Sequence, residues 1–269
     1  MVFVEALKVK ERVNEGAQVR FIDCRFDLMD AVAGERAFVE GHIEGAVYMH
    51  LERDLSDMTK VASGRHPMPD KSQLVQVFQS LGLTVDQEIY CYDDGAQPFA
   101  ARAYWMLTYA GFRNVFIVNG GIEALVQAGF NVTADVTQYE RSVITPVWQE
   151  DIYATRSDVF QVTQGEKDAV LVDARAAKRF SGEFEPLDPV AGHIPGARNF
   201  DWEQLKEEKS LVVTDALLKS VPRDETVVVY CGSGVTASPL YATLKEAGYT
   251  DVKLYVGSYS DWINEHEVE

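Results

Sequence analysis

The chain has 269 residues, of which 46% are hydrophobic and 25% are charged, a composition ordinary for a globular protein of one large or two ordinary domains. Its 25 Lys and Arg against 42 Asp and Glu give a formal net charge of −17, which repels nucleic acid phosphates and anionic lipids. We therefore expect no nucleic acid partner and no membrane partner. The first residues carry charges and lack a long apolar run, which predicts a cytoplasmic protein.

The first half of the chain alternates short apolar runs with turn and helical segments. In chain order the informative blocks are VRFIDCR (19–25), EGHIEGAVYM (40–49), EIYCYDDG (88–95) and AGFRNVFIVNGG (110–121). The polar, turn-rich stretch 51–70 separates the second block from the third, and a loop of that length is usually functional or disordered. Residues 131–150 are polar, lack a helical period and include Pro146, which is typical of a linker.

The second half repeats these blocks in the same order. The matching segments are AVLVDAR (169–175), AGHIPGARNF (191–200), TVVVYCGSG (226–234) and AGYTDVKLYVGS (247–258). Four matches in one order indicate two copies of one module. We therefore predict two domains, residues 1–139 and 140–269.

Each copy is expected to alternate strands with helices. In the second copy the strands are predicted at 169–172, 226–230 and 252–256, and a helix over 236–247 that ends before Gly248. This alternation predicts an α/β fold in which each domain is a mostly parallel sheet flanked by helices. Ligands of such sheets bind outside the carboxyl ends of the strands.

The two copies differ at one chemically important position. Alignment of the third blocks places Asp93 opposite Cys231, and a charged replacement indicates an exposed position. His42 precedes Asp93 by 51 residues, whereas His193 precedes Cys231 by 38, so the first copy carries 13 more. We assign the surplus to the polar stretch 51–70.

Cys231 lies where a buried strand should stop and a helix should begin. The residues between are Gly232, Ser233, Gly234, Val235 and Thr236. Two glycines allow the backbone to curl so that N–H groups converge on the sulfur, and the helix N-terminus adds partial positive charge. The turn therefore predicts a cradle for a thiolate, although a tight turn around an inert cysteine has the same pattern.

Other cysteine and serine chemistries fit less well. The G-x-S-x-G elbow of serine hydrolases is absent, and a phosphatase loop needs a guanidinium although no Arg occurs from 224 to 269. Cys24 and Cys91 are interpreted as small buried hydrophobic residues. Three scattered cysteines are too few for a disulfide framework or a zinc site, so we expect no metal and no organic cofactor.

The segment CGSGVTAS, the Asp-Ala-Arg and Gly-His-Ile-Pro-Gly-Ala blocks and the tandem arrangement resemble the two-domain rhodanese superfamily. The resemblance covers essentially the whole chain. It implies a catalytic second domain, a non-catalytic first domain with Asp93 in place of the cysteine, and an active site between them. It also implies that sulfur passes from a small-molecule donor to Cys231 as a persulfide, and then to cyanide or a thiol such as thioredoxin.

The loop sequence bears on the donor. Thiosulfate-using members of the family carry cationic residues directly after the cysteine, where this chain has Gly232 and Ser233. The loop is similar to members that use 3-mercaptopyruvate, in which Ser233 would assist proton transfer. By the same resemblance, Arg175 and Arg179 would bind the donor carboxylate and carbonyl. They could instead pair with nearby acidic residues, namely Asp173, Glu183 or Glu185.

The histidines divide by position. The RHPMP segment resembles the place of a family histidine that works with an acidic residue and the serine, which indicates His66 with Glu52, Asp54 being an equal rival. His42 and His193 recur in both copies regardless of the thiol, so we expect them to tie turns to backbone carbonyls.

Two other functions remain open at this stage. The protein could be a thiosulfate sulfurtransferase, or a sulfur or redox sensor that binds a partner through the same thiol. The set of Cys231, Arg175 and Arg179 favours an enzyme, because a sensor needs no carboxylate clamp.

Overall fold

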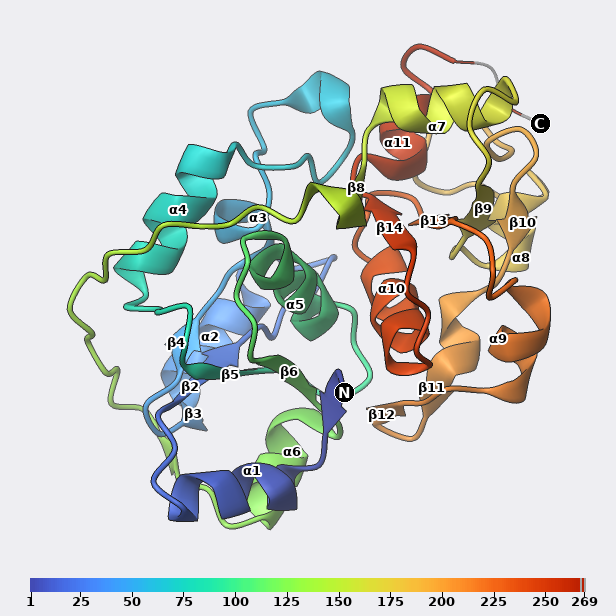
Figure 1. Ribbon diagram of the computed structural model, residues 1–269. Helices are drawn as coiled ribbons and strands as arrows, with labels where there is room; N and C mark the ends of the chain where they lie inside the picture. Colours follow the sequence, from blue (N-terminus) through green and yellow to red (C-terminus); the bar gives the residue numbers. More distant parts are fainter. Residues whose placement is uncertain (267, 269) are drawn as a thin grey trace. The chain divides into compact units, whose positions relative to one another are not determined.

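The computed structural model describes residues 1–266 and 268 and forms two compact units, each visible in Figure 1. The first unit comprises Met1–Ser56, Pro69–Gln149 and Glu207–Leu211; the second comprises Asp57–Met68, Glu150–Lys206 and Val212–Glu269. Residues 140–149, which the sequence assigns to the second domain, thus lie in the first unit, held there by backbone hydrogen bonds to Gln79 and Tyr109. The loop residues 57–68 lie in the second unit.

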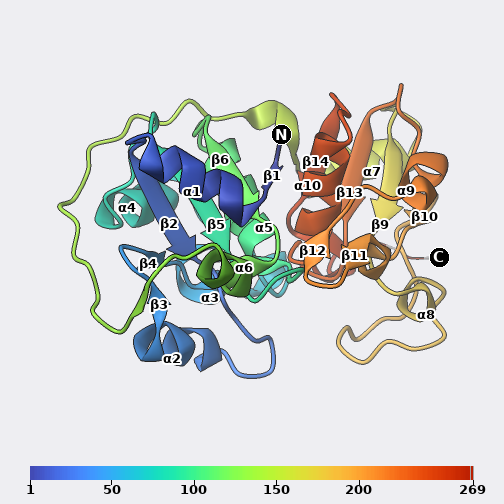
Figure 2. The ribbon, with the colours of Figure 1, turned by 90° about the horizontal axis from the view of Figure 1, so that it is seen from below.

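The first unit is built on a five-stranded parallel sheet in the order β1-β6-β5-β2-β4. Its strands are β1 (Phe3–Val4), β2 (Val19–Asp23), β4 (Val47–Tyr48), β5 (Glu88–Tyr92) and β6 (Val115–Val118). Its helices are α1 (Ala6–Asn14), α2 (Ala33–Glu40), α3 (Leu51–Asp54), α4 (Lys71–Ser80), α5 (Phe99–Tyr109) and α6 (Gly121–Gln127). Figure 2 shows α1 lying across the strands of this sheet.

The second unit has the same architecture. Its parallel sheet runs in the order β8-β14-β13-β9-β10, which is the order of the first sheet with each strand replaced by its repeat. The strands are β8 (Tyr153–Ala154), β9 (Val170–Asp173), β10 (Arg198–Asn199), β13 (Val227–Tyr230) and β14 (Val252–Tyr255). The helices are α7 (Arg156–Thr163), α8 (Ala177–Phe180), α9 (Asp215–Ser220), α10 (Ala237–Glu246) and α11 (Ser258–Trp262). The predicted tandem α/β fold is confirmed.

The remaining elements are short. They are the antiparallel pair β3 (His42–Ile43) and β7 (Val132–Thr133), the pair β11 (Lys206–Glu207) and β12 (Ser210–Leu211), and the 3-10 helices η1 (Val61–Ser63), η2 (Glu150–Ile152) and η3 (Trp202–Leu205). The predicted linker therefore begins as a strand, because β7 pairs with β3, and then continues without regular structure to Gln149.

The central strand β13 is apolar on both faces because helices cover both. Val228 and Tyr230 join the core formed with α7 and α11, while Val227 and Val229 are fully buried on the alternate face. Helix α10 packs against β13 and β14, as Figure 1 shows. It ends before Gly248, whose φ of +83° is favourable only for glycine, as the sequence predicted.

Candidate active site

Cys231 directly follows β13, the middle strand of the second sheet. It therefore lies at the carboxyl edge of parallel strands, where α/β sheets bind ligands. The residue is only 1% exposed, so the expectation of an exposed position is wrong. The reason is packing against the start of α11: the Tyr259 N–H donates to the Cys231 carbonyl and the Ser260 N–H to the Gly232 carbonyl, both at 2.9 Å.

The loop after Cys231 curls around the sulfur. The Gly234 backbone N–H donates to Cys231 Sγ at 3.1 Å. Gly234 has φ +73°, a conformation that glycine adopts without steric cost. Val235 and Thr236 then lead into α10, whose first N–H groups and dipole favour negative charge. The loop thus presents to the sulfur the amide donor that a thiolate cradle requires.

Ser258 holds the cysteine from the other side. The Cys231 N–H donates to Ser258 Oγ at 3.1 Å, and that hydroxyl donates to the Tyr255 carbonyl at 2.8 Å. Ser258 has φ +56°, a left-handed conformation that costs a non-glycine residue about 1 kcal/mol. The first copy has Gly121 at the matching position, with φ +60°. The sequence analysis did not identify Ser258. The signal was present, because Gly257-Ser258 replaces the Gly120-Gly121 pair of the first copy.

Gly232 leaves room for two arginine side chains, which the sequence did not show. A Cβ atom there would clash with Arg65 Nη2 and would lie 3.4 to 3.5 Å from the two terminal nitrogens of Arg179. Two guanidinium groups therefore lie against the residue that follows the cysteine. Burial lowers the pKa of Arg65. Sequence reasoning missed Arg65 because it belongs to the loop 57–68, where the copies do not align.

His66 and Ser233 are brought together. His66 Nδ1 lies 2.8 Å from Ser233 Oγ, and both residues are buried. The Arg65 N–H donates to Ser260 Oγ at 3.0 Å, which fixes the course of the loop beside α11. The structure thus joins one predicted histidine to the predicted serine, two residues after Cys231.

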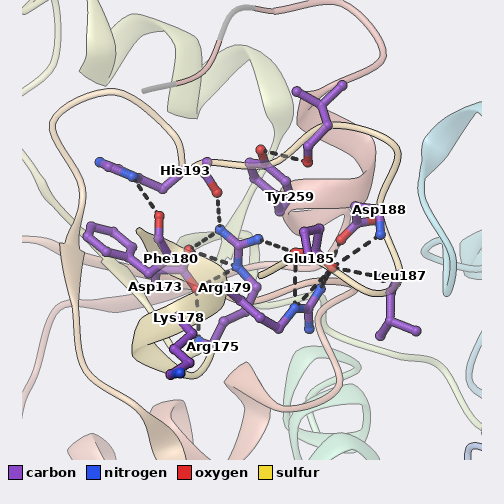
Figure 3. Close-up of polar contacts among 12 residues, drawn as sticks. Asp173, Arg175, Lys178, Arg179, Phe180, Glu185, Leu187, Asp188, His193 and Tyr259 are labelled. Atoms are coloured by element: carbon purple, nitrogen blue, oxygen red, sulfur yellow. Dashed lines mark hydrogen bonds and ion pairs between the residues drawn. The ribbon is translucent and has the colours of Figure 1, made fainter. Parts of the chain in front are cut away.

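The side chain of Arg175 has no exposed surface. Its guanidinium donates to Asp173 at 2.7 to 3.1 Å, to Glu185 at 3.1 Å and to the Gly192 carbonyl at 2.8 Å (Figure 3). Burial alone would lower its pKa, but the charge of Asp173 raises it overall. In the first unit Arg25 makes the matching contacts with Asp23 and the Gly41 carbonyl, although Asp93 stands there in place of Cys231. This geometry favours a structural role for Arg175 over direct contact with a donor.

Arg179 lies nearer the solvent, with 17% of its side chain exposed. It donates to Glu185 at 2.7 to 3.1 Å and to Asp188 at 3.0 Å. Arg175 and Arg179 do not lie on one helix, because α8 begins only at Ala177 after an extended residue. The two guanidiniums meet instead through Glu185, which accepts from both (Figure 3).

The two acidic candidates from the polar stretch lie in the first unit, on α3. The Glu52 N–H donates to His50 Nδ1 at 3.1 Å, which caps the start of this helix. The Asp54 carboxylate accepts from the His50 N–H at 2.7 Å and pairs with Arg53. Asp54 therefore has a local structural partner, and the choice between the two stays a prediction.

The repeated histidines are structural, as predicted. His42 Nδ1 lies 2.7 Å from the Phe38 carbonyl and His193 Nδ1 lies 2.9 Å from the Phe180 carbonyl. Each imidazole also stacks on the ring of that phenylalanine, with centroids 3.8 Å apart.

Asp93 occupies the matching strand end of the first unit. Its carboxylate accepts the N–H of Gly95 at 2.9 Å and of Ala100 at 3.0 Å, and the residue is buried. Burial raises its pKa to about 7, and backbone N–H groups, those of Ala100 and Gly95 first, oppose that shift. The first loop thus places a carboxylate where the second loop places a thiol.

Two classes of site find no support in the described part of the chain. Within residues 1–266 and 268, no group of three or more His, Cys, Asp or Glu is arranged to hold a metal ion. Over the same residues, no helix is both long and apolar enough to cross a bilayer.

Comparisons with known proteins agree with this architecture. The family model described as "Rhodanese-like domain" matches residues 5–128 and 158–265. A Pseudomonas aeruginosa protein provisionally named as a 3-mercaptopyruvate sulfurtransferase is 41% identical over 91% of this chain and 89% of its own. A Mycobacterium tuberculosis protein provisionally named as a thiosulfate sulfurtransferase, SseB, is 35% identical over 97% and 93%.

A solved structure is similar over nearly the whole chain. It is that of SseA from Escherichia coli, described as a 3-mercaptopyruvate sulfotransferase with the rhodanese fold. It superposes with a TM-score of 0.82 at 30% identity, covering 96% of this chain and 98% of that one. With two matching domains and close relatives along its full length, this chain belongs to the rhodanese-like domain family.

Proposed function

We propose that the protein is a sulfurtransferase that moves sulfur from 3-mercaptopyruvate, through a persulfide on Cys231, to a thiol or cyanide acceptor. One observation carries the proposal: at the end of β13, the Gly234 N–H donates a hydrogen bond to Cys231 Sγ, and two guanidinium groups lie beside this loop. An amide donor and a helix N-terminus stabilise a thiolate, and the terminal sulfur of a persulfide is an anion of the same kind.

In the first step the Cys231 thiolate attacks the sulfur of the donor. A sulfur–sulfur bond forms, the donor carbon–sulfur bond breaks, and its electron pair stays on carbon as the enolate of pyruvate. The proton of the donor thiol ends on that carbon, so the products are pyruvate and an anionic persulfide. An acceptor thiolate then attacks the outer sulfur and restores the Cys231 thiolate.

Ser233 and His66 are the proposed proton path. The 2.8 Å contact between Ser233 Oγ and His66 Nδ1 allows a proton to pass along the pair. Ser233 is two residues from Cys231, close to where the enolate would form. Glu52 stays in the proposal as the carboxylate that would support His66.

Arg179 is the proposed contact for the donor's anionic group, because it is partly exposed and lies against Gly232. Arg175 would act indirectly: it holds Glu185, and Glu185 holds Arg179. Gly232, Gly234, Val235 and Thr236 would form the persulfide cradle. No step requires a cofactor.

We extend the proposal to the acceptor and the compartment. Reduced thioredoxin supplies the dithiol that would remove the outer sulfur. The three cysteines, Cys24, Cys91 and Cys231, form no disulfide, and the reaction needs a thiolate, so a reducing compartment such as the cytoplasm suits it.

Thiosulfate is the second candidate donor. The neutral residues after Cys231 argued against a doubly charged donor, yet Arg65 and Arg179 bring cationic groups to the same place from other segments. In that reaction the thiolate takes the outer sulfur of thiosulfate and sulfite leaves. A purely sensing role is less well supported, because a sensor needs neither the paired guanidiniums nor the serine and histidine.

A single-turnover assay without acceptor tests the proposal. Wild-type protein should release one pyruvate per Cys231 from 3-mercaptopyruvate, and Cys231→Ser should release none. Cys91→Ser is the matched control, because Cys91 is also buried at a central strand and should leave the burst intact. Full release from Cys231→Ser would refute the assignment. If the protein releases sulfite from thiosulfate and no pyruvate from 3-mercaptopyruvate, thiosulfate is the donor.

A further inference from the structure

Four charged side chains from two segments meet beside Gly232. Arg65 comes from the loop 57–68, whereas Arg179, Glu185 and Asp188 come from α8 and the turn after it. Asp188 pairs with both guanidiniums, with Arg65 through Oδ1 and with Arg179 through Oδ2 at 3.0 Å. One carboxylate thus bridges two arginines at the edge of the cysteine loop.

Asp188 is held in this position by its own turn. The N–H groups of Leu187 and Asp188 both donate to Glu185 Oε1, at 3.0 and 3.2 Å. The Asp188 side chain is only 2% exposed. A carboxylate is costly to bury, so its place between two cations is a specific feature of the site.

The carboxylates hold only one side of each guanidinium. Arg179 donates from Nε to Glu185 and from Nη2 to both Glu185 and Asp188. Arg65 donates from Nη1 to Asp188. Within the described residues, Arg179 Nη1 and Arg65 Nη2 donate no hydrogen bond. These same two nitrogens lie beside Gly232, near the position a Cβ would take. Two charged donors with open N–H groups therefore border the loop of Cys231.

The charges within this ion-pair cluster balance. Three guanidiniums, those of Arg65, Arg175 and Arg179, pair with three carboxylates, those of Asp173, Glu185 and Asp188. The site has no surplus positive charge to offset both a thiolate and a doubly charged donor. A single negative charge on the donor fits the two open nitrogens with less repulsion.

We propose that Arg65 and Arg179 together bind the anionic group of the sulfur donor, and that Asp188, bridging them, makes the site select a monoanion over a dianion. The inference rests on the proposed function and assigns its donor class. Arg65 is then a donor-binding residue from outside the arginine pair found by motif, and Asp188 is the specificity-determining residue.

The test compares donor preference in matched variants. Asp188→Asn keeps the side-chain shape and removes one negative charge, and Glu183→Gln removes one from an exposed residue of the same segment. The second-order rate of Cys231 persulfide formation is measured with 3-mercaptopyruvate and with thiosulfate. We expect Asp188→Asn to raise the thiosulfate to mercaptopyruvate ratio about tenfold or more, and Glu183→Gln to change it less than about twofold. An unchanged ratio in Asp188→Asn, or an equal change in both variants, overturns the role of Asp188.

A separate experiment tests the role of Arg65. Arg65→Gln should slow loading by both donors about tenfold or more, whereas Arg223→Gln, which removes a guanidinium from the surface of the same unit, should not. Equal rates in Arg65→Gln and wild type overturn its role. If Asp188→Asn does not fold, the Arg65→Gln experiment still tests whether this guanidinium binds the donor.

Binding separates this inference from the proposed function. Calorimetric titration of pyruvate and of thiosulfate into Cys231→Ser needs no sulfur transfer. Pyruvate should bind more tightly, and adding Asp188→Asn should strengthen thiosulfate binding selectively. If neither donor loads wild-type protein, the proposed function fails, and the titration still decides whether the site selects monoanions. If donors load normally and Asp188→Asn leaves both titrations unchanged, only the inference fails.

Discussion

The carboxylate of Asp93 makes a quantitative prediction about the first unit. Its pKa is raised to about 7 by burial, against an ordinary value of 3.8, although backbone N–H groups of the loop partly oppose the shift. A raised carboxylate pKa means that the folded state binds the proton more tightly than the unfolded state. The stability therefore falls as pH rises from about 4 to about 7, and the full penalty is present above pH 7.

The size of this stability penalty follows from the same two pKa values. The interval from 3.8 to about 7 corresponds to about 4 kcal/mol at about 1.36 kcal/mol per pH unit. Asp93→Asn removes this penalty, but its amide NH₂ cannot accept the second of the two N–H bonds, a loss of about 1 kcal/mol. We expect the variant to be more stable than wild type by about 2 to 3 kcal/mol at pH 8, and slightly less stable at pH 4.

Urea unfolding at several pH values, followed by the fluorescence of Trp105 and Trp148 in the first unit, measures this difference. Asp30→Asn is a control, because Asp30 is exposed and its pKa is lowered by a hydrogen bond from Arg36, so its stability difference should not grow toward alkaline pH. A difference between Asp93→Asn and wild type that stays constant from pH 4 to pH 8 would refute the reasoning.

Three further predictions concern the second unit. Gly232→Ala should slow donor loading about tenfold with little loss of stability, because the added Cβ displaces only the end of the flexible Arg65 side chain. Stopped-flow loading and thermal unfolding check this, and a loading rate equal to wild type would contradict it. Ser233→Ala and His66→Gln should each slow pyruvate release about 100-fold, and the double variant should slow it no further. Sulfite release from thiosulfate should stay unchanged, because that reaction needs no proton on carbon. If the losses in the double variant were additive, a shared proton path would be excluded. Arg175→Lys and its first-unit counterpart Arg25→Lys should each lose about 3 kcal/mol of stability. Sulfur loading as fast in Arg175→Lys as in Arg25→Lys would contradict the indirect role of Arg175 in the site.

The sequence predicted the features that local pattern and repetition determine. The strands around residues 170, 227 and 252 lie within one or two residues of their predicted bounds, because uninterrupted β-branched runs between turn residues leave few alternatives. The position of Cys231 at a strand end and the N–H directed at its sulfur follow from the glycine spacing. The pairing of His66 with Ser233 was accessible only through the family resemblance.

Tertiary contacts determined what the sequence could not predict. Arg65 belongs to a loop with no counterpart in the second copy, so its place beside Gly232 had no local signal. Arg175 had the right chemistry for an anion but is enclosed by its own carboxylates. Cys231 was expected to be exposed because Asp93 replaces it, yet both are buried, since a buried carboxylate can be held by backbone N–H groups.

The most direct test of the central claim is the intact mass of reduced protein after brief exposure to 3-mercaptopyruvate, with peptide mapping of the product. The account predicts one added sulfur atom, located on Cys231, removed by dithiol and absent from Cys231→Ser. Sulfur located on Cys24 or Cys91, or a mass that does not change with either 3-mercaptopyruvate or thiosulfate, would contradict it.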